Sequence, residues 1–241
     1  MMKIRGVLFD KDGTLIDFDK TWQPIAERLA REIAEGDAQE AARLMRLAGF
    51  DEESGRFAAG SIFAAGNNLD LTDAWHPGLA PGERADKARE YDNYFSAFSA
   101  GASVPLTDLP HVLGLLRAKD MRLGIATNDV TASAEEFAKS AGLGSVFDFI
   151  TGYDGVPVPK PAGDMVVAFC ASVNLEAGEV AVVGDNTHDL EMAAAGGAGH
   201  KVGVLTGNGT RSDLEPLADI VLDHIDQLPD HLDELNESRA A

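Results

Sequence analysis

Cysteine is nearly absent from this sequence, since Cys170 is the only one among 241 residues. No disulfide can form within the chain, which agrees with a reducing compartment. Cys170 lies in the apolar segment 166–170, so we interpret it as a small buried side chain rather than a reactive thiol. A long apolar run and a cleavage signature behind a basic start are also lacking, and we therefore expect a cytoplasmic protein that does not bind membranes.

Positive charge is scarce. The chain has 20 Lys and Arg against 40 Asp and Glu, for a formal net charge of -20. A protein this acidic repels nucleic acid and anionic membranes, so neither is expected as a partner. An anionic substrate would have to be held by a local cluster of donors and a cation, against the field of the whole protein. The apolar fraction of 45% is otherwise that of an ordinary globular protein.

Short apolar runs rich in β-branched residues suggest buried strands. They occupy residues 4–9, 123–126, 180–183 and 202–205. Segments with helical periodicity separate them, at residues 109–119, 132–141, 162–173 and 190–195. Strands that are apolar on both faces are typical of parallel sheets covered by helices. The alternation predicts an α/β fold with a doubly wound, Rossmann-like parallel sheet.

A different pattern occupies residues 17–100, where Trp22 and Ile25 begin an apolar helical face and no comparable strand run occurs. We therefore expect an α/β hydrolase core made of residues 1–16 and 101–241, with an inserted all-helical cap subdomain over residues 17–100. Ligands of open α/β sheets bind outside the carboxyl ends of the strands. An insert that leaves after the first strand would hang over that place.

Polar side chains follow three of the predicted strands. In chain order they are Asp10 and Asp12, Thr127 and Asn128, and Asp185 and Asp189. If the strands are parallel, these groups meet at one edge of the sheet, and Lys160 can reach the same edge from its proline-flanked loop. Clustered carboxylates repel one another unless a cation lies between them. All-oxygen ligands without a Cys or His pair favour Mg²⁺ over Zn²⁺.

These residues form a motif series. Its members are Phe9-Asp10-Lys11-Asp12-Gly13-Thr14-Leu15, Thr127-Asn128, Lys160-Pro161 and Gly184-Asp185-Asn186-Thr187-His188-Asp189. The series resembles that of the haloacid dehalogenase-like (HAD) hydrolase superfamily, and is most similar to its phosphoglycolate phosphatase-like members. The resemblance extends from Ile4 to about Leu222, and the helical insert resembles the cap of that superfamily. A single aspartate after a strand more often caps a helix, so the interpretation depends on the complete series.

The resemblance implies a phosphatase that forms a covalent intermediate. Asp10 would attack phosphorus to give an aspartyl-phosphate, and Asp12 would act as general acid and base. Mg²⁺ would be bound by Asp10, by Asp185 and by the main-chain carbonyl of Asp12. Lys160 would be the third catalytic residue, because its ammonium would stabilise charge on Asp10 and on the transferring group.

The resemblance also implies the phosphate site. Thr127, Asn128 and Lys160 would bind phosphate oxygens, and Asp189 would support the site by orienting Lys160 or a water molecule. The six scattered histidines and the loop at residues 207–210 are given no part in the site.

The substrate depends on the cap. The resemblance favours a small phosphorylated metabolite, with 2-phosphoglycolate as the first candidate. Its carboxylate would need a cationic or amide partner, for which we consider Arg46, Arg56 and Lys20, and residues 55–61 form the candidate specificity loop. A phosphomutase of the β-phosphoglucomutase type or a pyrophosphatase would use the same core residues. A non-catalytic phosphate-binding protein would need neither nucleophile nor acid/base. The sequence leaves open whether the chain is a monomer or a homodimer.

Overall fold

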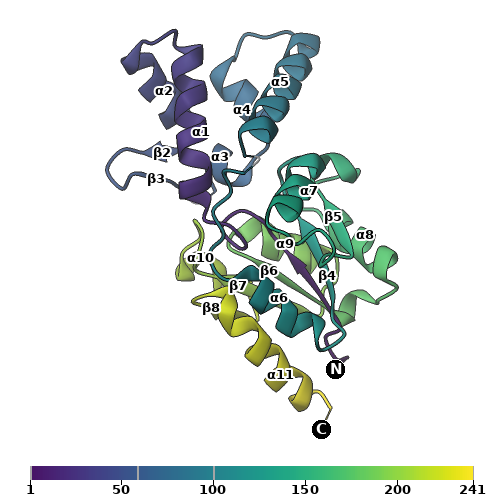
Figure 1. Ribbon diagram of the computed structural model, residues 1–241. Coiled ribbons are helices and arrows are strands. Elements are labelled where there is room, and N and C mark those ends of the chain that lie inside the picture. Colours follow the sequence, from purple (N-terminus) through teal and green to yellow (C-terminus); the bar gives the residue numbers. More distant parts are fainter. Residues whose placement is uncertain (1, 59, 100, 241) are drawn as a thin grey trace.

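The computed structural model describes residues 2–58, 60–99 and 101–240 (Figure 1). Its central element is a parallel six-stranded sheet in the order β5-β4-β1-β6-β7-β8. The strands are β1 (Gly6–Phe9), β4 (Arg122–Ala126), β5 (Phe149–Thr151), β6 (Val180–Gly184), β7 (His200–Val204) and β8 (Ile220–Leu222). The predicted α/β class and parallel sheet are confirmed. Strands β5 and β8 were not predicted, because three residues are too few to show a pattern.

Helices cover both faces of the sheet. They are α6 (Leu109–Arg117), α7 (Thr131–Ser140) and α11 (Leu228–Ser238) on one face, and α8 (Asp164–Val173) and α9 (Thr187–Ala195) on the other. Successive side chains of β1 point to opposite faces, so Val7 and Phe9 join the first hydrophobic cluster while Leu8 joins the second. A short helix, α10 (Arg211–Leu214), precedes β8. The sheet is therefore doubly wound.

The insert is a helical subdomain with its own hydrophobic core. Its helices are α1 (Phe18–Ile33), α2 (Ala38–Ala48), α3 (Ile62–Ala65), α4 (Asn68–Trp75) and α5 (Pro81–Ser99). Every buried member of its cluster lies between Phe18 and Phe95, within the range 17–100 that was predicted for the cap. The outer limits of the predicted domains, residues 1, 100 and 241, lie outside the described residues. Figure 1 shows the insert on one side of the sheet and both chain ends on the other.

One feature of the insert differs from the all-helical expectation. Strands β2 (Phe50–Asp51) and β3 (Arg56–Phe57) form a short antiparallel pair between α2 and α3. Gly49 and Gly55 have positive φ angles of 98° and 70°, a conformation that ends the helix and turns the chain back. Two residues per strand leave no periodicity in the sequence, so this pair could not be predicted.

The insert is joined to the sheet by two neighbouring segments of chain. The Asp17 N–H donates to the Val104 carbonyl over 2.8 Å, and the Leu106 N–H donates to the Leu15 carbonyl over 3.1 Å. Helix α1 starts directly after this junction, where the Asp17 carboxylate accepts from the Lys20 N–H over 3.0 Å and caps it. The junction thus places α1 beside the residues that follow β1. None of the helices in the described ranges is long and apolar enough to cross a membrane.

Candidate active site

A pocket lies between the insert and the carboxyl ends of the central strands. Residues Phe9 of β1, Ile125 of β4 and Val183 of β6 are aligned in register, so the segments that follow them start side by side. The pocket is lined by every side chain that the sequence assigned to the site, namely Asp10, Asp12, Thr127, Asn128, Lys160, Asp185 and Asp189. The structure therefore brings together residues from four separate parts of the chain.

Lys160 is buried between two carboxylates. Its Nζ lies 2.6 Å from Asp10 Oδ1 and 2.5 Å from Asp189 Oδ1, and it donates a hydrogen bond to each. Burial alone lowers the pKa of Lys160, but the charges of Asp10 and Asp189 outweigh burial and raise it, so the ammonium stays charged. Asp189 also accepts from the Asn186 N–H over 3.0 Å, which caps α9 and fixes the carboxylate that orients Lys160.

Three buried carboxylates converge on one point. Ligand oxygens of Asp10, Asp185 and Asp189 lie within 4.8 Å of one another. Burial raises the pKa of Asp10 to about 7, and burial together with the charges of Asp10 and Asp189 raises the pKa of Asp185 well above its usual value. One ammonium cannot neutralise three carboxylates. The three carboxylates therefore need more positive charge than Lys160 supplies. Their oxygen atoms suit a hard divalent cation such as Mg²⁺.

Asp185 is held from two sides by loops with little side-chain bulk. The Asn208 N–H donates to Asp185 Oδ2 over 2.9 Å, and the Thr14 hydroxyl lies 3.4 Å from Oδ1. A Cβ atom added at Gly13, whose φ is +89°, would lie 2.6 Å from Asp185 Oδ2. A Cβ atom added at Gly207 would lie 1.9 Å from the same oxygen. The loop at residues 207–210, which was given no role, therefore positions Asp185. The clash expected at Gly207 cannot be inferred from a sequence.

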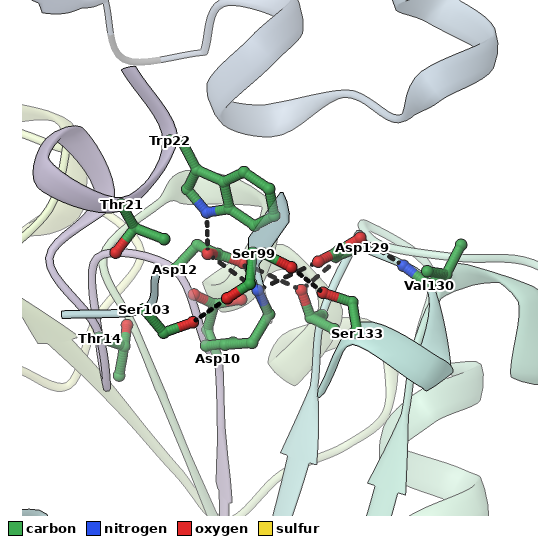
Figure 2. A network of polar contacts seen from close by, with 12 residues as sticks. Asp10, Asp12, Thr14, Thr21, Trp22, Ser99, Ser103, Asp129, Val130 and Ser133 are labelled. Atoms are coloured by element: carbon green, nitrogen blue, oxygen red, sulfur yellow. Dashed lines mark hydrogen bonds and ion pairs between the residues drawn. The ribbon is translucent and has the colours of Figure 1, made fainter. Parts of the chain in front are cut away.

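Asp12 is surrounded by hydrogen-bond donors (Figure 2). The indole N–H of Trp22 donates to Asp12 Oδ1, and Lys11 Nζ lies 2.7 Å from Oδ2. The same ammonium lies 3.1 Å from Asp129 and 4.8 Å from the centre of the Trp22 ring. The charges of Asp12 and Asp129 outweigh burial and raise the pKa of Lys11. Lys11, Trp22 and Asp129 were not predicted as site residues.

The predicted phosphate-binding residues follow β4. Thr127 is buried, its hydroxyl accepts from the Asp129 N–H over 3.1 Å, and it lies 3.5 Å from Asp12 Oδ2. Asn128 lines the pocket next to it. This arrangement places a hydroxyl beside Asp12, in the pocket that Asp10 and Asn128 also line. Hydrogen-bond donors are what a phosphate group requires.

The cationic side chains suggested for the cap lie elsewhere. Arg46 pairs with Glu52 at 2.6 Å on the surface, and Lys20 pairs with Asp17 at 2.7 Å. Arg56 pairs with Asp19 at 2.6 Å and donates to the Gly207 carbonyl over 3.2 Å, which links the insert to the loop that holds Asp185. Of the described lining residues, none is one of these three cations or belongs to residues 55–61.

The insert contributes instead the segment that follows this predicted loop. Residues 62–64 and 66–68 line the pocket, together with Phe18 and Trp22 of α1 and Phe95 of α5. His188 lines the core side, so not every histidine lies outside the site as expected. Its position within the Asp185–Asp189 motif was the signal that could have identified it.

Comparison with known proteins gives the family. The sequence model of the haloacid dehalogenase-like hydrolases matches residues 4–197. Probable phosphatase IndB from Dickeya dadantii is 39% identical over 103 residues, which are 43% of this chain and 44% of that protein. Phosphoglycolate phosphatase from Chromobacterium violaceum is 28% identical over 234 residues, 94% of this chain and 96% of the relative.

A solved structure shows the same fold. It comes from a Bacteroides fragilis protein assigned to the haloacid dehalogenase-like hydrolases and has a TM-score of 0.73 at 20% identity. The match covers 94% of this chain and all of that one. With the motif residues gathered at one pocket, this chain belongs to the haloacid dehalogenase-like hydrolase family and is a phosphatase that acts on phosphoric monoesters.

Proposed function

We propose that this phosphatase hydrolyses a small phosphomonoester in two steps through an aspartyl-phosphate on Asp10. The observation that carries the proposal is the position of the Asp10 carboxylate, 2.6 Å from the Lys160 ammonium and grouped with Asp185 and Asp189. Asp10 is therefore oriented by a fixed cation at the base of the pocket. A carboxylate held in this way can approach a phosphorus atom without having to reorganise.

In the first step a carboxylate oxygen of Asp10 forms a bond to phosphorus and the bond from phosphorus to the ester oxygen breaks. Asp12 gives its proton to that leaving oxygen, so the alcohol departs neutral. In the second step Asp12 takes a proton from a water molecule, the water oxygen attacks phosphorus, and orthophosphate and the free Asp10 carboxylate are formed. Trp22 and Lys11 hold Asp12 where it can serve both steps.

Mg²⁺, when bound by Asp10, Asp185 and the Asp12 main-chain carbonyl, would screen the repulsion between the nucleophile and the phosphate. Asp189 holds Lys160, which offsets charge on Asp10 and on the phosphoryl group. Thr127 and the backbone N–H of Asn128 would bind the phosphate oxygens. Each predicted site residue thus has a task that agrees with its position.

The names of the relatives leave the substrate open. Several are phosphoglycolate phosphatases, while others of 25–27% identity are named N-acetylmuramic acid 6-phosphate phosphatase and pyrophosphatase PpaX. These names support 2-phosphoglycolate as one candidate ester. A phosphomutase of the β-phosphoglucomutase type and a pyrophosphatase are the alternatives on the same catalytic residues. A protein that only binds phosphate would have no need for the nucleophile and the acid/base that are present here.

The test is orthophosphate release from a panel of phosphomonoesters and pyrophosphate, with Mg²⁺ or with a chelator. We expect release that requires Mg²⁺ and is abolished in Asp10→Asn, while Asp230→Asn, an exposed aspartate on α11, keeps full activity. A second readout is thermal unfolding, since Mg²⁺ should raise the Tm of the wild type and not that of Asp185→Asn. Release that persists in Asp10→Asn would refute the covalent mechanism.

A further inference from the structure

The insert lines its part of the pocket mainly with apolar side chains, and the proposed function places the leaving group there because the core residues would bind the phosphate. Six of these side chains are large, namely Phe18, Trp22, Ile62, Phe63, Leu71 and Phe95. The rings contact one another edge to face, with centroids 6.0 Å apart for Phe18 and Phe63, 5.6 Å for Phe63 and Phe95, and 5.9 Å for Trp22 and Phe95. We call these side chains the aromatic wall. Its rings already pack against one another, and they offer apolar contact area to a substrate rather than charge.

Two amides supply the polar groups of the same wall. Oδ1 of Asn67 accepts from the Leu69 N–H over 2.8 Å, and Nδ2 of Asn68 donates to Asp92 over 2.7 Å. Within the described part of the chain, these bonds leave the Asn67 Nδ2 donor and the Asn68 Oδ1 acceptor available to a ligand. The insert can therefore form hydrogen bonds with neutral groups of a substrate, such as a hydroxyl or an amide.

The pocket has no cation to spare for a second anionic group. Lys160 is the only Lys or Arg among its described lining residues, and it is already bound to Asp10 and Asp189. Five aspartates line the same pocket, namely Asp10, Asp12, Asp129, Asp185 and Asp189. A carboxylate or second phosphate on the leaving group would lose its hydration without gaining a Lys or Arg partner from the described lining residues.

We infer, on the basis of the proposed phosphatase activity, that the preferred leaving group is an uncharged alcohol with an apolar face and one or two neutral hydrogen-bonding groups. This choice disfavours 2-phosphoglycolate, pyrophosphate and any sugar bisphosphate, since each has a second anion to place. The same preference argues against a mutase, because a mutase of this type depends on a bisphosphate. This inference concerns the leaving group alone, because the core supplies the residues that would bind the phosphate group.

The direct test compares substrates that differ by one charge. The amide of 2-phosphoglycolate has nearly the shape of 2-phosphoglycolate but no carboxylate, and benzyl phosphate has a phenyl ring where ethyl phosphate has a methyl group. We expect kcat/KM to be at least about tenfold higher for the amide than for the acid, and about tenfold higher for benzyl than for ethyl phosphate. Equal or better turnover of 2-phosphoglycolate would overturn the inference.

Variants change the side chains of the same pocket. Phe63→Arg adds a cation to the wall, so the preference for the amide over the acid should fall to near unity or reverse. Leu47→Arg, on the exposed side of α2 and outside the pocket lining, adds the same charge and should leave the preference unchanged.

His188→Gln tests the histidine that lines the core side of the pocket. A collapse of 2-phosphoglycolate turnover alone in this variant would show a carboxylate site and contradict the inference.

A binding experiment keeps this inference separate from the proposed activity. Benzylphosphonate and phosphonoacetate resist hydrolysis. Benzylphosphonate carries an apolar ring, and phosphonoacetate carries a carboxylate. Calorimetry in the presence of Mg²⁺ should show tighter binding of benzylphosphonate. Absence of turnover for every ester would defeat the proposed function, whereas tighter binding of phosphonoacetate would defeat only the inference about the leaving group.

Discussion

The indole N–H of Trp22 donates a hydrogen bond to the carboxylate of Asp12, although the two residues belong to the insert and to the core (Figure 2). Both oxygens of this carboxylate also contact Lys11, whose ammonium lies over the same indole ring. The proposed acid/base is thus held by a residue of the insert. In the proposed mechanism, contact between insert and core would therefore affect the chemistry as well as access to the pocket.

Trp22→Phe removes this hydrogen bond while keeping an aromatic ring in the wall. We expect kcat to fall roughly tenfold for benzyl phosphate, whose alcohol must be protonated as it leaves, and to fall less for p-nitrophenyl phosphate, whose phenolate leaves readily. Trp75→Phe is the control, because it removes an indole hydrogen bond of 2.8 Å to the Leu44 carbonyl inside the insert. Equal losses for both esters would indicate a purely structural role for Trp22.

Lys160→Met leaves Asp10 and Asp189 buried without their cation. Because breaking a buried ion pair strands the remaining charge, we expect the free energy of unfolding to fall by about 3–5 kcal/mol in urea titrations with a chelator present. Adding Asp189→Asn to this variant should restore part of the loss. Lys139→Met, whose partner Glu136 lies 3.3 Å away at the surface, should change stability by less than about 0.5 kcal/mol. A Lys160→Met protein as stable as the wild type would contradict this account.

Gly207→Ala should displace Asp185, since the new Cβ would lie 1.9 Å from its Oδ2 atom. We expect the apparent affinity for Mg²⁺, measured by thermal shift, to fall roughly tenfold. Gly114→Ala in α6 is the matched control, because no atom lies within 4 Å of the added methyl group. That variant should bind Mg²⁺ normally and be slightly more stable. Unchanged Mg²⁺ affinity in Gly207→Ala would show that Asp185 does not bind the ion.

His200 predicts a loss of stability in mild acid. Burial, together with the neighbouring His231, lowers the pKa of His200 to about 4, and the two Nε2 atoms lie 2.8 Å apart. Between pH 6.5 and 4 the unfolded chain binds a proton at this residue and the folded chain does not, so stability falls as the pH falls. The Tm of His200→Phe should drop by a few degrees less between pH 7.5 and 5 than that of the wild type. His111→Phe, at an exposed position, should behave like the wild type.

The catalytic half of the site could be predicted because strand ends determine where the next residues lie. Asp10, Thr127 and Asp185 follow adjacent strands of one parallel sheet, so their proximity follows from the apolar runs before them. Lys160 could be added because its motif accompanies the others. The doubly wound core was predictable for the same reason, since its longer strands and helices show clear periodicity.

The insert could not be predicted in the same detail. Helix α3 has four residues and α4 has eight, which is too short for a helical pattern to stand out. Trp22 was interpreted as part of an apolar face, and it does pack against Phe95, but its indole N–H also reaches Asp12. Such a double role depends on how the insert meets the core. Phe63 and Asn67 likewise become pocket residues only through that contact.

The junction between insert and core has a consequence for how such proteins diversify. The two segments that join the insert to the core are already neighbours, because hydrogen bonds link Asp17 to Val104 over 2.8 Å and Leu106 to Leu15 over 3.1 Å. A piece attached through adjacent ends can be exchanged for another of different length without moving any strand of the sheet. Grafting the insert of a relative at this junction would therefore exchange two things together, the residues that line the insert side of the pocket and the residue that stands at Trp22 beside Asp12.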